Sequence, residues 1–248
     1  PHMSNQAPRL SIVIPAKNEA LRLPPSIRQI RNIFPDEAWE FIIVIELSAD
    51  GTEVAVREAI GGDRRFVVIA NPVARGKGYA VKTGMLRARG DLIFFMDADL
   101  SVPLGYIPEF LKHAEEADVL VGSRRHPESI IRVHQSFTRE FSGRMFNLAL
   151  RLAGITRLAD TQCGFKAFRR DAAQAVFSKL EQDGFGFDVE VLLLASQLGF
   201  RSLELPVEWA DVKGSKVSFL SGFEALRDAI LAARRIKRKY PTHAKSRS

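Results

Sequence analysis

The chain has 248 residues, 46% of them hydrophobic and 26% charged, which is the composition of an ordinary soluble globular protein. The single cysteine, Cys163, excludes a disulfide framework, and no apolar run approaches the ~20 residues that span a bilayer. The net charge of +7 comes from the segment after Ala233, which holds seven Lys and Arg residues and no acid; the body is therefore neutral, and no nucleic-acid partner is expected.

Short apolar runs alternate with segments of helical periodicity through the first half of the chain. Strands separated by helices of this length predict right-handed crossovers and a parallel sheet, and the nearly continuous apolar runs predict burial on both faces. The predicted strands are Leu10–Ile14, Phe41–Ile45, Phe66–Ala70, Leu92–Met96 and Asp118–Gly122, and the predicted helices are Pro25–Phe34, Thr52–Ile60, Gly78–Arg89 and Leu104–Ala117.

The alternation changes after Gly122, where a polar stretch, Ser123–Ser136, precedes a more specialised second half. The elements predicted there are helix Phe137–Ala153, strand Phe165–Arg169, helices Asp171–Lys179 and Asp188–Leu198, strand Ser202–Val207 and a final helix Ser221–Tyr240. Pro1–Met3 resembles a cloning remnant. We expect one α/β domain over residues 8–220, a doubly wound and mostly parallel sheet, followed by an amphipathic helix and basic tail over 221–248.

Two aspartates separated by one residue end the predicted strand Leu92–Met96. Alternate side chains of an extended chain share a face, so Asp97 and Asp99 can present oxygens to one cation. Hard oxygen ligands suit Mg²⁺ or Mn²⁺, and Mg²⁺ commonly completes its coordination with substrate phosphates. Alone, such a pair is more often a solvated turn. The neighbouring motifs favour the metal.

Four polar clusters follow the first four strands, and ligands of open parallel sheets bind at that edge. The clusters are Pro15–Glu19, Glu46–Thr52, Asn71–Gly78 and Asp97–Asp99. Each has an ordinary structural explanation, such as a helix cap at Asn18 or Thr52 or a turn at Asp50. Their occurrence at one edge favours a ligand site.

The loop Arg75-Gly-Lys-Gly78 is typical of anion binding. Its two glycines allow close backbone approach, the helix that follows directs N–H groups outward, and Lys77 adds a positive charge. The spacing is not that of a Walker loop, and no GxGxxG follows the first strand, so a dinucleotide cofactor is not expected. A bound diphosphate with a metal on Asp97 and Asp99 accounts for both motifs.

With these residues assembled, the chain resembles an inverting family 2 glycosyltransferase of the GT-A fold, and within it the dolichyl-phosphate and polyprenyl-phosphate glucosyl- and mannosyltransferases. The resemblance covers about Leu10 to Ser218 and rests on Ser11-Ile-Val-Ile-Pro-Ala-Lys-Asn-Glu19, Asp50-Gly-Thr52, Gly76-Lys-Gly78, Met96-Asp-Ala-Asp-Leu-Ser101, Gly122-Ser-Arg124, Asp160-Thr-Gln-Cys-Gly-Phe-Lys166, Phe187-Asp-Val-Glu190, Pro206-Val-Glu-Trp209 and Gly214-Ser-Lys216. The motifs at 160–166 and 187–190 mark this branch; the first-half motifs mark the wider family.

The resemblance implies a role for each matching residue. The base and ribose pocket would be lined by Pro15, Glu19, Glu46 and Asp50. The nucleotide diphosphate would meet Lys77 and Lys216, while Asp97 and Asp99, with Ser101, would hold the metal. The acceptor phosphate or the sugar would meet Arg124 and Arg139, and Lys166 belongs to the catalytic set through its motif.

Two positions depart from the family pattern. Glu46 replaces a shorter carboxylate after the second strand, which leaves the choice of nucleotide base open. UDP-glucose is the favoured donor, and GDP-mannose remains an alternative because of this departure. Gly143 stands where relatives carry Ser, with Ser142 adjacent.

The acceptor decides which residues the reaction needs. A lipid phosphate is already anionic near neutral pH, since the second pKa of a phosphomonoester is about 6, so paired arginines would suffice. A hydroxyl acceptor, on a small metabolite or a glycan, needs a carboxylate to take its proton, and Asp160 and Asp188 are the candidates. A nucleotide-sugar-binding module without turnover is the non-enzymatic alternative.

The final predicted helix bears on localisation. Apolar residues recur at three- and four-residue steps from Phe223 to Tyr240, with basic residues between them. Such a helix either packs on the core with a solvated basic end or lies in a membrane interface. No signal peptide is visible, so we expect a cytoplasmic protein, at the inner face of the membrane if the helix is interfacial.

Overall fold

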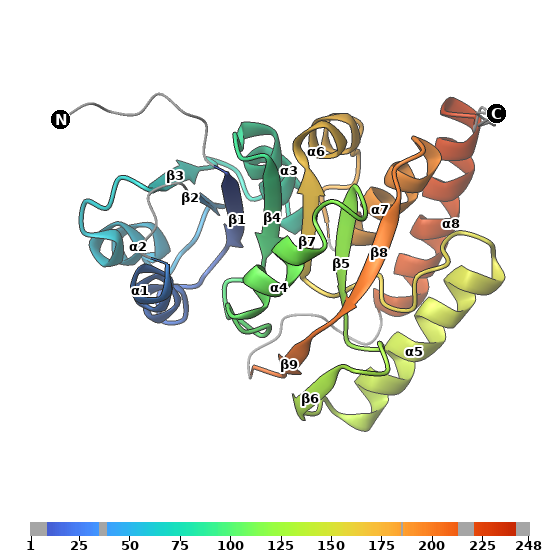
Figure 1. The fold of residues 1–248 in the computed structure, drawn as a ribbon, viewed down its shortest axis with the longest axis horizontal. Helices are drawn as coiled ribbons and strands as arrows, with labels where there is room; N and C mark the ends of the chain where they lie inside the picture. The colour runs from blue at the N-terminus through green and yellow to red at the C-terminus, as the bar shows by residue number, and fades with distance from the viewer. Residues whose placement is uncertain (1–8, 35–38, 185, 213–220, 242–248) are drawn as a thin grey trace.

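The computed structural model describes residues 9–34, 39–184, 186–212 and 221–241, with side chains of the last segment from Leu226 onward. Figure 1 shows one central sheet with helices on both faces. Among the described helices, none is long and apolar enough to cross a membrane.

The central sheet has seven strands in the order β3-β2-β1-β4-β7-β5-β8. All neighbouring strands are parallel except β7, which runs antiparallel to both β4 and β5. The mostly parallel α/β sheet predicted from the sequence is confirmed. The strands are β1 (Leu10–Ala16), β2 (Trp39–Ile45), β3 (Phe66–Ala70), β4 (Leu92–Met96), β5 (Val119–Ser123), β7 (Phe165–Arg169) and β8 (Ser202–Pro206).

The helices follow the predicted order, with differences mainly at their ends. They are α1 (Leu23–Ile33), α2 (Thr52–Ile60), α3 (Lys77–Arg87), α4 (Tyr106–Lys112), α5 (Phe137–Leu152), α6 (Arg170–Phe177), α7 (Phe187–Gln197) and α8 (Ser221–Lys239). The largest difference is α4, which was predicted over Leu104–Ala117. It ends early because i→i+3 hydrogen bonds of His113, Ala114 and Glu116 close tight turns there.

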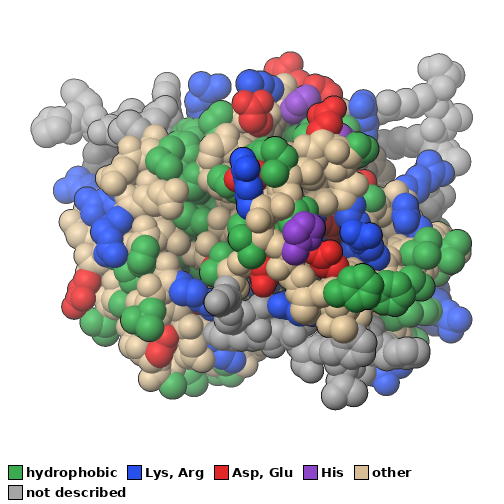
Figure 2. Space-filling model, turned by 90° about the horizontal axis from the view of Figure 1, so that it is seen from below, with side chains coloured by type: hydrophobic (Ala, Val, Ile, Leu, Met, Phe, Trp, Pro, Cys, Tyr) green, Lys and Arg blue, Asp and Glu red, His purple; other side chains and the backbone are tan. Residues whose placement is uncertain are grey.

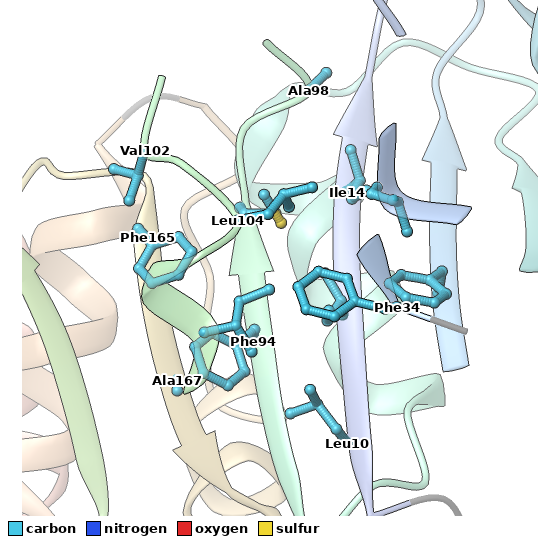
Figure 3. Packing of buried hydrophobic residues seen from close by; sticks show 14 of the residues in the cluster. Leu10, Ile14, Phe34, Phe94, Ala98, Val102, Leu104, Phe165 and Ala167 are labelled. Carbon is cyan, nitrogen blue, oxygen red and sulfur yellow. The ribbon is translucent and has the colours of Figure 1, made fainter. Parts of the chain in front are cut away.

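Two hydrophobic cores lie on opposite faces of the sheet, because successive strand residues point to opposite sides. On β1, Ile12 and Ile14 join the core that also contains Phe94 and Phe165, whereas Val13 joins the core with Phe95. Figure 3 shows part of the first core, with Leu10, Ile14 and Phe34 beside the aromatic rings. This double burial explains why the strands read as continuous apolar runs.

Proline is tolerated inside β1 because of its position in the pairing. Pro15 is buried opposite Val44 of β2, whereas the pairing of β1 with β4 ends at Val13. The missing N–H of Pro15 therefore falls where the β4 ladder has already stopped. The predicted place of Pro15 in a base pocket stays a prediction.

A two-stranded ribbon lies beside the main sheet and was not predicted. It pairs β6 (Ile130–Val133) in parallel with β9 (Glu208–Ala210), with an irregularity after Ile131. The sequence around β6 lies in the polar stretch Ser123–Ser136, to which no element was assigned. The ribbon places Trp209 near the sheet edge that carries the polar loops, because the Ala210 N–H donates to the Ser101 carbonyl.

The terminal helix α8 packs on the protein rather than presenting its apolar face outward. Ala229, Ala233 and Ile236 are buried in the core that includes α7. Arg235 bridges Glu190 and Glu181, which fixes part of the basic end as well. Of the two arrangements expected for this helix, the described residues adopt the packed one; Phe223 lies outside the described side chains.

Candidate active site

The loops that follow β1 and β2 are tied together at the carboxyl edge of the sheet. The Asn18 backbone N–H donates to Ser48 Oγ at 3.0 Å, and the Asn18 amide oxygen accepts from the Ala49 N–H at 3.0 Å. Asn18 has a left-handed φ of 53°, a conformation that asparagine tolerates better than most residues. The predicted polar edge is therefore a continuous surface and not a set of independent turns.

Two carboxylates predicted for the base and ribose pocket are held by protein groups. Asp50 accepts from Thr52 Oγ1 at 2.5 Å and from the Ala20 N–H at 3.0 Å. Burial would raise the pKa of Asp50, but these hydrogen bonds outweigh it and lower the pKa. Glu19 receives both Nε and Nη2 of Arg22. Both carboxylates thus organise the loops that would border a nucleotide.

Glu46 determines the conformation of the Arg75–Gly78 loop. Its carboxylate is buried and accepts the N–H groups of Arg75 at 3.0 Å and Gly76 at 2.9 Å. The side chain departs from the family pattern by being longer, and this length is used to reach across to the next loop. The first N–H groups of that loop are therefore bonded to Glu46, and a bound anion would have to use others.

The glycines of this loop accommodate a protein segment. A Cβ on Gly76 would collide with the Asp183 carbonyl, and one on Gly78 with the Gln182 carbonyl. The Tyr79 N–H donates to the Asp183 carbonyl at 3.1 Å, and Arg75 bonds the Asp183 carboxylate. We expected the glycines to admit an oxyanion; in the structure they admit the 182–184 backbone, which covers part of the α3 N-terminus.

Lys77 contacts the first aspartate of the predicted metal pair. Its Nζ lies 2.5 Å from Asp97 Oδ1 and 5.9 Å from the Phe187 ring centroid. Burial would lower the pKa of Lys77, but the Asp97 and Asp188 carboxylates raise it, so the ammonium stays charged. Gly164 allows this arrangement, because any Cβ there would strike the Asp97 carboxylate.

Asp99 lies beside Asp97 but has no contact with a cation like the one that Asp97 makes with Lys77 among the described residues. Burial and the Asp97 charge both raise the pKa of Asp99, while hydrogen bonds from Ser101 lower it less. Leu100 between them has a left-handed φ of 51°, an uncommon conformation for leucine. Two crowded carboxylates with hard oxygen donors fit a divalent ion such as Mg²⁺ or Mn²⁺.

The protein alone offers few ligands to such an ion. Across the described ranges, no three His, Cys, Asp or Glu side chains come together in a metal-binding group. Ser101 is half-buried and donates its N–H to Asp99. A site built on Asp97 and Asp99 would take its remaining ligands from water and the donor phosphates, as Mg²⁺ sites often do.

Arg124 and Asp160 form a buried ion pair. Arg124 donates Nε and Nη2 to the two Asp160 oxygens at 2.7 and 2.8 Å, and its backbone N–H also donates to Asp160. Asp160 has no exposed surface. Burial would raise the pKa of Asp160, but Arg124 holds it well below its usual range. In this arrangement the Asp160 carboxylate is buried and bonded to Arg124, and its role as a general base stays a prediction.

Lys166 and Asp188 form a second buried pair. Lys166 Nζ lies 2.5 Å from Asp188 Oδ1 and 2.6 Å from the Cys163 carbonyl. Lys166 is fully buried on β7, and Asp188 lies in the first turn of α7. Lys166 and Asp188 are thus bonded to each other, and their catalytic roles stay predictions.

Arg139 lies in the first turn of α5, half-buried. The Arg124 guanidinium lies over the Trp209 ring, 5.5 Å from its centroid. Lys216, expected at the diphosphate, lies outside the described residues.

Sequence reasoning missed Arg22, Gly164 and Asp183. Of these, only Gly164, inside the motif of residues 160–166, carried a signal that could have identified it.

Solved structures with the same fold include a glucosyl-3-phosphoglycerate synthase from Mycobacterium tuberculosis in complex with Mn²⁺, uridine diphosphate and phosphoglyceric acid. It is 18% identical, with a TM-score of 0.67, and the match covers 92% of this chain and 78% of that one. At this identity the likeness establishes the fold, a GT-A glycosyltransferase fold.

The family is assigned from sequence similarity. Residues 11–177 match the profile described as Glycosyl transferase family 2, and the chain belongs to this family and is a glycosyltransferase. A dolichyl-phosphate beta-glucosyltransferase from Trichomonas vaginalis is 32% identical over 84% of this chain and 68% of its own length. One from Drosophila melanogaster is 33% identical over 90% and 73%.

Proposed function

We propose that this glycosyltransferase moves glucose from UDP-glucose to a polyprenyl phosphate, with Mg²⁺ or Mn²⁺ held by Asp97 and Asp99. The names of the relatives support the sugar and the acceptor class. Neighbouring structures that contain uridine diphosphate with Mn²⁺ or Mg²⁺ support the donor and the ion. GDP-mannose is the alternative donor. A membrane-borne acceptor would place the reaction at the cytoplasmic surface of a membrane.

The donor site would lie at the carboxyl edge of β1–β4. A divalent ion on Asp97 and Asp99 would offset the negative charge that develops on the departing nucleoside diphosphate. Lys77 stays protonated between its carboxylates and adds positive charge at the same place. Glu46 keeps the loop that carries Lys77 in position through its two backbone hydrogen bonds.

The state of Asp160 and Asp188 is the observation that supports a phosphate acceptor. A hydroxyl acceptor needs a carboxylate to receive its proton. Asp160 is buried under Arg124, and Asp188 is bound to Lys166, so neither of these two is free for that task. A phosphate acceptor already carries negative charge near neutral pH and needs no base.

The acceptor would attack the anomeric carbon on the face opposite the leaving diphosphate, which converts an α-linked donor sugar into a β-linked product. Arg124, oriented by its two bonds to Asp160, and Arg139 are the candidates to receive the acceptor phosphate. Guanidinium groups suit this task because they offer several N–H donors in a plane.

Matched acceptors test the proposal. The protein would be incubated with UDP-glucose and Mn²⁺, together with a short polyprenyl phosphate or the corresponding polyprenol in detergent. We expect a glucosylated lipid only with the phosphate. Transfer to the polyprenol, or to a soluble hydroxyl acceptor in the absence of lipid, would contradict the proposal and favour the hydroxyl alternative.

The non-enzymatic alternative is excluded by the family assignment. A parallel reaction with GDP-mannose identifies the donor. Product from GDP-mannose alone would retain the acceptor chemistry but overturn the assignment of the sugar and the base.

A further inference from the structure

Helix α5 carries a row of large apolar side chains on its solvent side. The row recurs at four- and three-residue steps, so its members share one helix face. Phe137 is 82% exposed and Leu152 is 81% exposed, and the Phe137 and Phe141 rings stack with centroids 6.3 Å apart. We call this row the α5 stripe; its members are Phe137, Phe141, Met145, Leu148 and Leu152.

The opposite side of α5 faces the protein, where Asn147 and Leu150 are buried. The α5 stripe therefore lies on the side of the helix away from the core and is not the edge of the buried side. On the adjoining ribbon, Ile130 and Val133 of β6 are also exposed. Figure 2 shows hydrophobic side chains gathered over the α5 end of this face, with Lys and Arg side chains beside them. An apolar surface of this extent commonly marks an interaction site.

Three arginines accompany the stripe. Arg144 and Arg151 are exposed on α5, each within about one turn of a stripe residue, and a Cβ on Gly143 would lie near the Arg125 guanidinium. Burial lowers the pKa of Arg125, the Asp160 charge raises it, and the charges of Arg124, Arg144 and Arg151 lower it. Among the described residues, no hydrogen bond or ion pair engages the guanidinium groups of Arg125, Arg144 or Arg151.

Apolar residues beside arginines that no ion pair engages have the composition of a helix that lies in a lipid interface, with rings in the acyl region and arginines at the headgroups. We infer that α5 docks the protein onto an anionic membrane surface, with the α5 stripe inserted and Arg125, Arg144 and Arg151 on lipid phosphates. A second copy of the chain is disfavoured as occupant, because pairing this face with itself would juxtapose the arginines.

The inference deepens the proposed function, since a polyprenyl phosphate resides in a bilayer. It replaces α8, whose apolar face is buried, as the element that reaches the membrane. Docking can be measured without donor or acceptor, so a failure to dock and a failure to transfer glucose are separate results.

Vesicle flotation tests the inference. The 248-residue protein would be mixed with vesicles of phosphatidylcholine alone or of phosphatidylcholine with phosphatidylglycerol. We expect binding to the anionic vesicles, a loss of at least about tenfold for F137S/F141S/L152S, and about tenfold for R144Q/R151Q. These side chains are exposed, so circular dichroism and melting temperature should stay unchanged.

Matched controls remove the same chemistry elsewhere. V54S/L231S removes exposed apolar side chains from α2 and α8, and R64Q/R87Q removes two exposed arginines far from α5 in sequence. Both should bind like the unaltered protein. Absence of binding to either vesicle, an equal loss in V54S/L231S, or a stripe variant that binds normally but changes from dimer to monomer would each overturn the inference.

Discussion

Two aspartate sites on neighbouring strands and loops of the sheet have opposite electrostatic states. Asp97 and Asp99 stand together at the end of β4, partly exposed, and the pKa of Asp99 is raised by burial and by its neighbour. Asp160 is fully buried, and Arg124 holds its pKa low. At the first site the negative charge of the carboxylates exceeds the positive charge beside them, so the site is suited to bind a cation. At the second site the protein itself supplies the positive charge that balances the carboxylate.

Functional and structural carboxylates can be distinguished by the charged group that each one contacts. Both sites consist of Asp in motifs shared with a family of enzymes, so residue type does not distinguish them. A carboxylate paired with a buried guanidinium contributes through stability. Asp97 and Asp99 share one ammonium, that of Lys77, and their remaining repulsion costs stability unless a second cation joins them.

The largest expected effect is on catalysis at the first site. Asp99→Ala should reduce glucose transfer by at least about a hundredfold, because the charge on the leaving diphosphate is no longer offset. The free energy of unfolding should change little or increase. Asp91→Ala at the other end of β4, where the side chain is 77% exposed, is the control and should transfer glucose normally. Rates near normal for Asp99→Ala would remove the distinction between the two sites.

At the second site the effect should appear in stability. Asp160→Asn leaves the Arg124 charge without its partner, which typically costs about 3–5 kcal/mol for a buried pair. Denaturant unfolding measures the loss. The control, Glu53→Gln, removes the same charge from an exposed pair with Arg57 and should cost less than about 1 kcal/mol. Equal costs for the two variants would show that burial of the Asp160 pair is not what stabilises it.

The two sites should also respond differently to pH. Because the folded-state pKa of Asp99 is raised, its ionisation costs stability at pH values above that pKa, and the cost is relieved as the pH falls through it. Asp160 has a lowered folded-state pKa, so its contribution is full above the unfolded value, about 3.9, and is lost as the pH falls toward the lower value.

Unfolding curves of the metal-free protein and of Asp99→Asn between pH 7 and about 4 provide the measurement. The variant should be the more stable protein near pH 7, and this advantage should shrink on acidification. An advantage that grows on acidification would mean that the pKa of Asp99 is lowered.

The smallest expected effect concerns the loop that covers the α3 N-terminus. Asp183→Asn weakens the link to Arg75, but both side chains are substantially exposed, so the stability cost should stay below about 1 kcal/mol. Transfer should fall only severalfold through displacement of Lys77. Gly78→Ala provides a comparison, because the added Cβ would collide with the backbone of the same loop. This variant should lower transfer more than Asp183→Asn does.

The parallel strands of the first half and the shared edge of its polar loops were predictable, because buried parallel strands have continuous apolar runs. The insertion of β7 antiparallel between β4 and β5 was not, since the apolar pattern of Phe165–Arg169 does not distinguish a parallel strand from an antiparallel one. The glycines at 76 and 78 were assigned to a ligand because sequence does not show that residues 182–184 pack against them.

Helices α5 and α8 make the same point about amphipathic patterns. Both carry apolar residues at helical spacing with basic residues between, yet α8 buries Ala229, Ala233 and Ile236 while α5 exposes Phe137 and Leu152. Periodicity predicts an apolar face; which neighbour covers that face is decided by the tertiary arrangement.

Calorimetric titration of uridine diphosphate, with and without Mn²⁺, into the unaltered protein and Asp99→Asn tests the central assignment most directly. If Asp97 and Asp99 hold the ion that joins the nucleotide, Mn²⁺ should strengthen nucleotide binding in the unaltered protein and have no effect in the variant. The same strengthening by Mn²⁺ in Asp99→Asn would contradict the assignment.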